Sequence, residues 1–415
     1  MKPSRSTTRE SRSANHKPCP HYPSCASCPL IGTAYGDQLD RKRERVGAAF
    51  APYPRLAHLE VPRPVGSPRA FGYRNQAKLV ARRAQPGLLL GVYRPGTHQV
   101  VDISACPIHD PLINTVLAGV RRTVERRQLA TYDERTGAGW LRYVVVRVSH
   151  WQKAAQVILV VGEREPSLER AVGGELCRLR GVSSVVLNVN PARGNVILGE
   201  QFIPLTRETS LIERVGPLKL KSRAGAFLQA NIAAARRVYD HVVRWAEPKS
   251  HEIAIDIYAG VGAISFWLAG QAGRVFGVEE SPMAVLDAKE NIRLNGFHNV
   301  RFLCGAVETV LPDLAARLDR TDVITLNPPR KGASEATRRA ILACAPSRVV
   351  YVSCDPVTLA RDLDWFAARG YSPIKVQPFD LFPQTEHVEC VVLLRGCERI
   401  DPRPSRASGR AEKTQ

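Results

Sequence analysis

The first part of the chain mixes short β-branched stretches with apolar positions at helical spacing, and glycine and proline separate them. β-Branched runs fit a pleated, half-buried surface, whereas an apolar residue every third or fourth position fits one face of a helix. Such a mixture without a regular order indicates an α+β domain, which we expect over residues 19–245. Its strands are expected at 141–149, 155–162 and 182–190, and its helices at 111–127, 167–181 and 231–248.

After His251 the pattern changes to a strict alternation of strand and helix. Short apolar runs that are each followed by a helical stretch or turn are typical of a parallel, doubly wound sheet. The last two runs, at 371–379 and 387–396, follow each other without a helix and predict an antiparallel edge pair. We therefore expect an α/β, Rossmann-like fold with a mostly parallel sheet over residues 246–397. The other strands of this sheet are expected at 253–260, 274–280, 300–304, 322–328 and 347–354.

The chain carries 59 Lys and Arg against 39 Asp and Glu, which gives a formal charge of +20 and a pI near 9.9. Its two ends contribute only about +4 over residues 1–18 and about +2 over residues 398–415, leaving about +14 on the folded body. We expect both ends to be disordered tails, because they lack the apolar residues that offset chain entropy. A basic body favours nucleic acid as a partner, although a solvated basic face accounts for some chains of this kind.

No apolar run among the 415 residues is long enough to span a bilayer, and residues 1–18 contain no apolar stretch of signal-peptide type. We expect a soluble monomer in the cytoplasm, with no membrane partner. Ten cysteines without a secretion signal argue against disulfides, because cytoplasmic thiols are kept reduced. Clustered cysteines therefore favour metal binding or catalysis.

Four of the cysteines form a candidate metal site. Cys19, Cys25 and Cys28 have the spacing C-x5-C-x2-C, and Cys106 follows in ISACPIHD. Four soft thiolates suit either an iron–sulfur cubane or a structural zinc ion, and the spacing does not separate the two. Histidines that flank the first cysteine keep mixed zinc ligation open.

A glycine-rich turn opens the second part of the chain. Gly260 and Gly262 follow an apolar run and precede a helix, where glycine lets the backbone approach a ligand at the switch point of the sheet. Glu279 ends the next run, where a carboxylate can accept hydrogen bonds from both ribose hydroxyls. Ser265 replaces the third glycine of a dinucleotide fingerprint, which favours S-adenosylmethionine over NAD. Asn327, in Asn-Pro-Pro-Arg, is expected to face the pocket between cofactor and substrate.

A thiol and a carboxylate stand 35 residues apart near the end of the chain, Cys354 in YVSCDPVT and Glu389 in FPQTEHVEC. This pair suits the methylation of a pyrimidine carbon. C5 of uracil is a poor nucleophile until a thiolate adds at C6, and a base must then remove the C5 proton so that the thiol can leave. Taken alone, a cysteine after a buried strand is more often a small core residue, whereas a carboxylate inside HVECVVLL needs a partner or a function.

The chain resembles the RNA uracil-C5-methyltransferase family in five motifs that follow in the family's order: FLQAN (227–231), DIYAGVG (256–262), NPPRKG (327–332), YVSCDPVTLARDL (351–363) and FPQTEHVE (382–389). The resemblance implies a class I, S-adenosylmethionine-dependent methyltransferase domain over residues 246–397, preceded by an RNA-binding domain that carries the cysteines. It implies that Cys354 is the nucleophile and Glu389 the proton acceptor. Positions that contact S-adenosylmethionine or lie beside the target base are matched by Gln229, Tyr258, Glu279 and Asn327.

The chain departs from the family's pattern at two positions. Many members have Asp where this chain has Asn327, and many have Cys where it has Ala259. Asn keeps a hydrogen-bonding group but loses the charge, which puts the recognition of the pyrimidine edge in question. The glycines beside Ala259 still provide the turn.

For the four cysteines, the same resemblance implies a 4Fe-4S cluster with a structural role, with zinc as the alternative. Members with these cysteines resemble enzymes that act on large-subunit ribosomal RNA, so we expect 23S ribosomal RNA as the substrate and transfer RNA as the alternative. Two rival interpretations stay open. One is an amino-group methyltransferase, which would carry an aromatic residue where Arg330 stands; the other is a non-catalytic RNA-binding factor of ribosome assembly.

Overall fold

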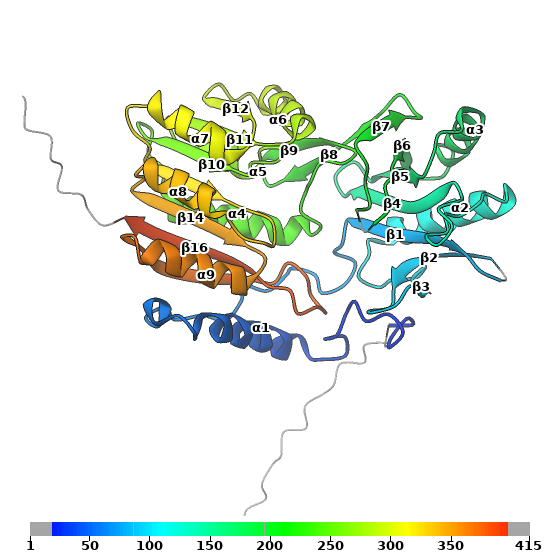
Figure 1. Ribbon diagram of the computed structural model, residues 1–415, viewed down its shortest axis with the longest axis horizontal. Coiled ribbons are helices and arrows are strands. Elements are labelled where there is room, and N and C mark those ends of the chain that lie inside the picture. Colours follow the sequence, from blue (N-terminus) through cyan, green and yellow to red (C-terminus); the bar gives the residue numbers. More distant parts are fainter. Residues whose placement is uncertain (1–18, 86, 195, 397–415) are drawn as a thin grey trace, which may run out of the picture.

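The computed structural model describes residues 19–85, 87–194 and 196–396. The predicted tails at 1–18 and 398–415 lie outside the described residues. Two large β-sheets, one toward either end of the molecule in Figure 1, organise this part of the chain. Within these ranges, no helix is both long and apolar enough to cross a membrane.

The first sheet has the strand order β3-β2-β1-β4-β5-β6-β7, in which neighbours pair antiparallel except for the parallel β5 and β6. Helices α2 (Pro111–Arg126) and α3 (Pro166–Leu176) cover one face; α2 packs on β2, β4 and β5, and α3 packs on β6 and against α2. Every strand and helix predicted for this region is present, β4 with its predicted bounds. The strands are β1 (Gln76–Arg83), β2 (Leu88–Tyr93), β3 (Val100–Asp102), β4 (Leu141–Ser149), β5 (Ala154–Val161), β6 (Val182–Val189) and β7 (Gln201–Pro204).

A β-ribbon and a helix connect the first sheet to the second. The ribbon pairs β8 (Ser210–Val215) with β9 (Leu218–Arg223), and it is held to α6 (Pro282–Asn295) by Asn291, whose side chain bonds both the N–H and the C=O of Lys221 at 2.7 and 3.0 Å. Helix α4 (Ile232–Ala246) begins at Asn231, whose side chain accepts a hydrogen bond from the N–H of Ala234. It ends two residues before Pro248, near the predicted end.

The second sheet has the strand order β12-β11-β10-β13-β14-β16-β15. The five strands β10 to β14 run parallel to one another. β16 and β15 add an antiparallel pair at one edge, which confirms the predicted edge pair. β10 is buried along its whole length, as expected of the mostly apolar run IAIDI at the centre of a parallel sheet. α4, α5 and α6 cover one face of the sheet, and α7, α8 and α9 cover the other. The remaining bounds are β10 (Ile253–Ile257), α5 (Ala263–Ala269), β11 (Arg274–Glu279), β12 (Val300–Cys304), α7 (Val307–Ala316), β13 (Val323–Leu326), α8 (Glu335–Ala343), β14 (Arg348–Ser353), α9 (Pro356–Ala367), β15 (Tyr371–Phe379) and β16 (Glu389–Gly396).

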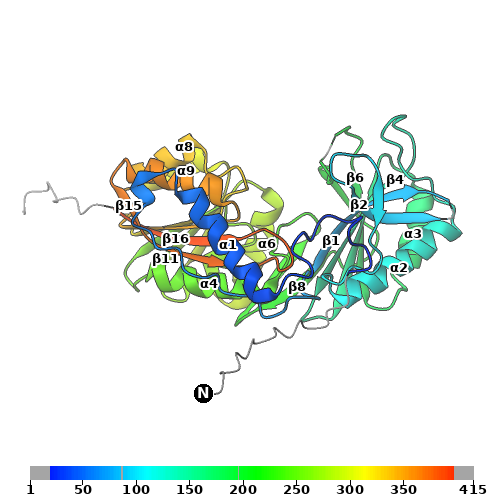
Figure 2. The ribbon, with the colours of Figure 1, turned by 90° about the horizontal axis from the view of Figure 1, so that it is seen from below.

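Helix α1 (Tyr35–Phe50) lies on the second sheet, against α9 and β15, although it precedes every strand of the first (Figure 2). Val46 and Phe50 join the core on that face, together with Leu56 from the short helix η1 (Pro54–Leu56). Lys42 forms a buried ion pair with Asp380, with 2.5 Å between Nζ and Oδ1. The division of the chain at residue 245 stays a prediction, and the segment before β1 contributes to the core around the second sheet.

Candidate active site

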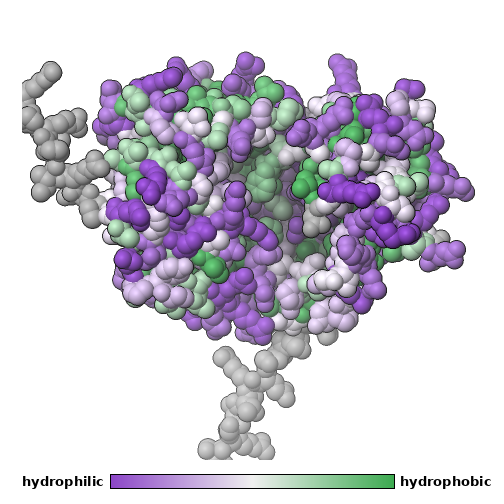
Figure 3. Space-filling view, in the orientation of Figure 1, coloured by the Kyte–Doolittle hydropathy of each residue, from purple (hydrophilic) through white to green (hydrophobic). Residues whose placement is uncertain are grey.

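The predicted site residues gather at one edge of the second sheet. Tyr258 and Asn327 follow the neighbouring strands β10 and β13, Cys354 follows β14, and Glu389 is the first residue of β16. Because β16 runs antiparallel to β14, its start lies beside the carboxyl ends of the parallel strands. This edge faces the hollow that separates the two sheets, and Figure 3 shows apolar residues in the depth of that hollow. Ligands of doubly wound sheets bind at such an edge.

The turn after β10 has the backbone shape that its glycines predict. Gly260 and Gly262 have φ values of 56° and 94°, a region that residues with a Cβ seldom adopt. A Cβ on Gly262 would stand 2.6 Å from Cζ of Phe302, whereas one on Gly260 would meet no atom within 4 Å. The backbone at Gly260 is therefore open to a ligand, and that at Gly262 is closely packed.

Glu279 fixes this turn. Its carboxylate accepts hydrogen bonds from the backbone N–H groups of Gly260 and Ser281, at 2.9 and 2.8 Å. One oxygen takes each bond, so each keeps a further lone pair for a ligand.

A cavity lies beside the turn and is lined by residues from both parts of the chain. Gln229 and Phe227 come from the connection before α4, and Tyr258, Gly260 and Asn327 come from the second sheet. Tyr258 has a φ of 59°, and its hydroxyl lies 3.1 Å from the hydroxyl of Thr337. Four of the predicted cofactor residues, Gln229, Tyr258, Gly260 and Asn327, thus line the cavity. Gly262 and Glu279 do not line it, and Glu279 is connected to it through its hydrogen bond to Gly260.

Asp256 is a buried carboxyl group that the sequence patterns did not assign to the site. It accepts hydrogen bonds from the hydroxyls of Ser265 and Thr325 at 2.6 and 2.7 Å, and it lines the same cavity. Burial raises its pKa to about 6, against the effect of these hydrogen bonds. The available signal was the one polar residue in IAIDI. Its position below the turn ties β10, α5 and β13 together.

Cys354 and Glu389 come together at the end of the β14–β16 ladder. Ser353 pairs with Cys390 in this antiparallel ladder, so Cys354, which follows Ser353, and Glu389, which precedes Cys390, lie at the same end of it. Glu389 is 2% exposed, and burial raises its pKa to about 8. Cys354 is half-buried; burial, followed by the nearby Glu389, raises its pKa to about 11. A protonated thiol and a carboxyl group that titrates near neutrality therefore face each other.

Arg330 stands close to both groups. Its charge lowers the pKa of Cys354 and of Glu389, in opposition to burial. Its Nη2 lies 3.2 Å from Nε2 of His387, and no described carboxylate forms an ion pair with it. His387 has a pKa below its ordinary value, because of burial and then of the Arg330 charge, so its neutral ring accepts this hydrogen bond.

Tyr239 links this pair to the cavity beside the glycine turn. It lines that cavity, and its pKa is raised by burial, then by Glu389 and Asp256. Both carboxyl groups are thus within electrostatic reach of one buried phenol. The predicted catalytic and cofactor residues therefore share one region of the molecule.

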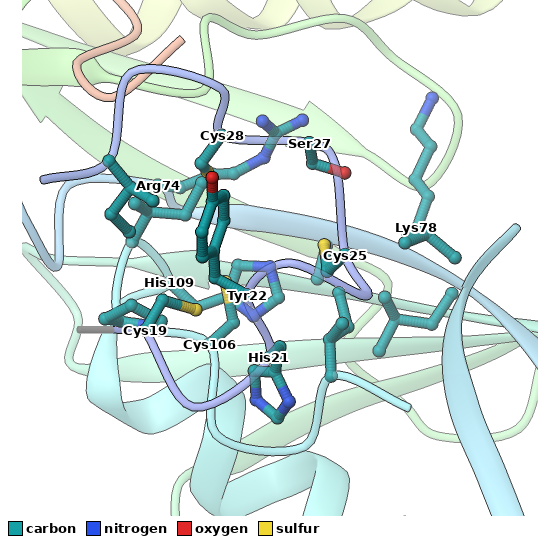
Figure 4. A pocket seen from close by; sticks show the side chains of 17 residues that line it. Cys19, His21, Tyr22, Cys25, Ser27, Cys28, Arg74, Lys78, Cys106 and His109 are labelled. Carbon is teal, nitrogen blue, oxygen red and sulfur yellow. The ribbon is translucent and has the colours of Figure 1, made fainter. Parts of the chain in front are cut away.

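The four predicted metal ligands, Cys19, Cys25, Cys28 and Cys106, line a second cavity of about 110 Å³ beside the first sheet (Figure 4). Burial raises the pKa of Cys28 to about 12, and the three other thiols add to this effect. In the described part of the chain, however, no group of three or more His, Cys, Asp or Glu side chains is arranged to hold a metal ion. The structure thus brings the four thiols to one cavity without showing a formed metal centre.

The fold and this site define a class I methyltransferase. A family model described as tRNA (Uracil-5-)-methyltransferase matches residues 194–397. An uncharacterized RNA methyltransferase of Geobacter sulfurreducens is 41% identical over 377 residues, covering 91% of this chain and 76% of the relative. Another, from Halalkalibacterium halodurans, is 37% identical over 378 residues, covering 91% and 82%. The chain belongs to the RNA (uracil-5-)-methyltransferase family.

A solved structure is similar over most of its length. The crystal structure of Pyrococcus abyssi tRNA (uracil-54, C5)-methyltransferase in complex with S-adenosyl-L-homocysteine aligns with a TM-score of 0.70 and 24% identity. The alignment covers 90% of this chain and 86% of that one. The arrangement of both sheets is thus that of a known methyltransferase fold.

Proposed function

We propose that this protein transfers a methyl group from S-adenosylmethionine to C5 of a uridine in 23S ribosomal RNA through a covalent adduct on Cys354. The observation that carries the proposal is the meeting of Cys354 and Glu389 beside the cavity of the glycine turn. A thiol and a carboxyl group placed together have no structural need for each other, since the charge of Glu389 raises the cost of ionising Cys354.

Each residue of the pair has one task in this reaction. The Cys354 thiolate adds to C6, and C5 becomes nucleophilic enough to take the methyl group, which S-adenosylmethionine supplies. Glu389 then accepts the C5 proton, the C6–sulfur bond breaks, and the thiolate is restored. Arg330 supports both steps because its positive charge favours the ionised forms of both groups.

We place S-adenosylmethionine at the glycine turn, held by Gln229, Tyr258, Gly260, Gly262 and Glu279, with Asn327 between it and the uracil. The open space at Gly260 and the free lone pairs of Glu279 support this assignment. Asn327 lines the cavity and carries both a donor and an acceptor for the imide edge of a pyrimidine.

We propose that Cys19, Cys25, Cys28 and Cys106 hold a 4Fe-4S cluster, with zinc as the alternative. Four sulfur donors around one cavity fit either group, and both groups bind cysteine as the thiolate. The role is structural, because the reaction contains no redox step. Iron and acid-labile sulfide in anaerobically purified protein, lost in Cys106→Ser, would support the cluster, whereas stoichiometric zinc would replace it.

The choice of 23S ribosomal RNA rests on the four cysteines. The family description and the Pyrococcus abyssi neighbour favour transfer RNA as the alternative. Mass mapping of ribosomal and transfer RNA from cells that lack the protein decides between them. Loss of 5-methyluridine from one large-subunit site is expected, and its loss from transfer RNA alone would move the proposal to the alternative.

Two variants test the chemistry. With transcripts of both RNA classes, Cys354→Ala should form no 5-methyluridine, and Glu389→Gln should accumulate a denaturation-resistant protein–RNA adduct. Cys304→Ala, which removes the exposed cysteine at the last position of β12, is the matched control and should retain activity. Full methylation by Cys354→Ala would exclude the covalent route and favour an amino-group methyltransferase. An absence of methylation by the unaltered protein on either RNA class, together with normal binding, would favour a binding factor.

A further inference from the structure

The segment that leads into Glu389 is fastened to the beginning of the chain. The carbonyls of three consecutive residues each accept a hydrogen bond from a residue that precedes β1. The three bonds join Lys42 Nζ to Phe382 O at 3.1 Å, Tyr73 Oη to Pro383 O at 3.0 Å, and Leu30 N to Gln384 O at 3.1 Å. Segment 382–387 thus takes its position from residues more than 300 positions away in the sequence.

Gln384 is the most constrained residue of this segment. It has a φ of 71°, a left-handed conformation that costs a residue with a Cβ about 1 kcal/mol or more, and it is 3% exposed. Its partner on α1 is Gln38: the side-chain Oε1 of Gln38 accepts the N–H of Gln384 at 2.8 Å, and its Nε2 donates to Oε1 of Gln384 at 3.0 Å. Two buried hydrogen bonds therefore hold a backbone shape that the residue would otherwise leave.

Further hydrogen bonds extend from Gln384 toward Glu389, which lies five residues later in the chain. The hydroxyl of Thr385 donates to Phe382 O at 2.7 Å and accepts the N–H of His387 at 3.3 Å, so the segment keeps its shape up to the residue that contacts Arg330. Glu389 follows as the first residue of β16. Its position is then set by the strand on one side and by the bonded segment on the other.

We propose that Gln384, held by Gln38, is a positioning residue that sets the carboxylate of Glu389 against Cys354. This inference rests on the proposed function of that pair, and it adds a requirement from α1, none of whose residues line the cavity beside the glycine turn. A tight clamp is needed because a base must lie within hydrogen-bond reach of the proton it removes, and small displacements of such a group are costly.

The test compares Gln38→Leu with Asn299→Ala. The first variant leaves the catalytic segment unchanged and removes both clamp bonds. The second variant removes two hydrogen bonds that the side-chain amide of Asn299 donates to the carbonyls of Ala269 and Ala272, far from the reactive pair. In Gln38→Leu, amide hydrogen exchange in residues 385–388 should be about tenfold faster, and the RNA adduct should accumulate because proton removal slows. Asn299→Ala should show neither change, even at a similar loss of thermal stability.

Gln384→Gly serves if Gln38→Leu does not fold, because glycine adopts a positive φ without strain and removes the clamp bond between the two side chains, while the bond from the backbone N–H of residue 384 can remain. Unchanged amide hydrogen exchange in residues 385–388 of a folded variant would overturn the inference. Faster exchange would also overturn it if methylated RNA left the adduct at the wild-type rate. Glu389→Gln is run beside them. If it forms no adduct, the proposed chemistry fails, and the exchange result alone then decides whether the clamp holds the segment.

Discussion

Burial makes Glu389 unlike a glutamate at the surface. With its side chain 2% exposed, the neutral form is favoured and the pKa rises to about 8, although Arg330 acts in the opposite direction. A carboxylate of this basicity is a stronger proton acceptor than an ordinary one. The same burial costs stability wherever the unfolded chain would be ionised, so the group is retained against a penalty.

Glu389→Gln should therefore raise the free energy of unfolding as activity is lost. Between the ordinary value of 4.5 and about 8, the unfolded chain releases the proton while the folded chain keeps it, so wild-type stability falls as pH rises through this window. The uncharged amide avoids this loss. Urea unfolding should show a gain on the order of 2 kcal/mol at pH 8 and little at pH 4.5. An equal effect at both pH values would contradict the assigned ionisation.

Gly262→Ala should damage the cofactor turn. The new methyl group would meet Cζ of Phe302 at 2.6 Å, at a φ of 94° that alanine tolerates poorly. Thermal unfolding should report a loss of about 1–3 kcal/mol, and calorimetry should report weaker binding of S-adenosylmethionine. Gly174→Ala in α3 is the control, because a Cβ there meets nothing within 4 Å and should stabilise the helix by about 0.5–1 kcal/mol.

Motifs located the side chains that we propose to be reactive, whereas their surroundings required the structure. Cys354 and Glu389 follow from the chemistry of a thiol and a carboxylate in short motifs, and the predicted edge pair explains why they meet. The contact of Arg330 with His387 depends on the path of two loops, which no periodic pattern describes. Gln384 looked like an ordinary polar loop residue, because its left-handed backbone follows from distant contacts.

Helix α1 shows why one element escaped the sequence patterns. A buried helical face normally reads as apolar residues three and four apart, and α1 supplies Leu39, Val46 and Phe50. The positions between them on that face are Gln38 and Lys42, which are both 1% exposed. Their polar groups are buried because partners on the segment after β15 satisfy them. Strands β4 and β10, by contrast, are buried at every position and mostly apolar, and they were predictable.

The buried pair on α1 gives a direct test of this docking. Lys42→Met should lower the free energy of unfolding by about 3–5 kcal/mol, because Asp380 would remain charged and buried without its partner. Arg45→Met on the same helix is the control. Its pair with Glu386 is exposed, with 44% and 59% of the side chains accessible, and should contribute less than about 1 kcal/mol. Equal losses in denaturant unfolding would show that α1 is not anchored by this contact.

The charge of the entire chain determines how it meets RNA. A net +20 predicts that many contacts go to phosphates, whose neutralisation releases counterions. Affinity for a 23S transcript should therefore fall more than about tenfold between 50 and 200 mM salt in filter binding. A salt-independent affinity would mean that base and shape contacts dominate. The cofactor, being bound by hydrogen bonds at the turn, should show little of this dependence.

More of the architecture could be predicted from the sequence for the second sheet than for the first. Strict alternation of strand and helix predicts parallel strands, so the parallel part of the second sheet and its antiparallel edge pair followed from the pattern, whereas the strand order required the structure. The first sheet mixes antiparallel pairs with one parallel pair, and its strand order depends on contacts that no local pattern records. The crossing of α1 to the second sheet likewise comes from tertiary packing.

Within the described residues the chain passes between the two halves three times: from the cysteine segment to α1, back to β1, and again from the β8–β9 ribbon to α4. Two bodies joined by three connections of the chain are less free to move apart than two bodies joined by a single hinge. The hollow between them should keep nearly the same width when RNA arrives. Under the proposed mechanism, a uridine must then leave its own helix to reach the sulfur of Cys354, because the protein has little freedom to open and close around it.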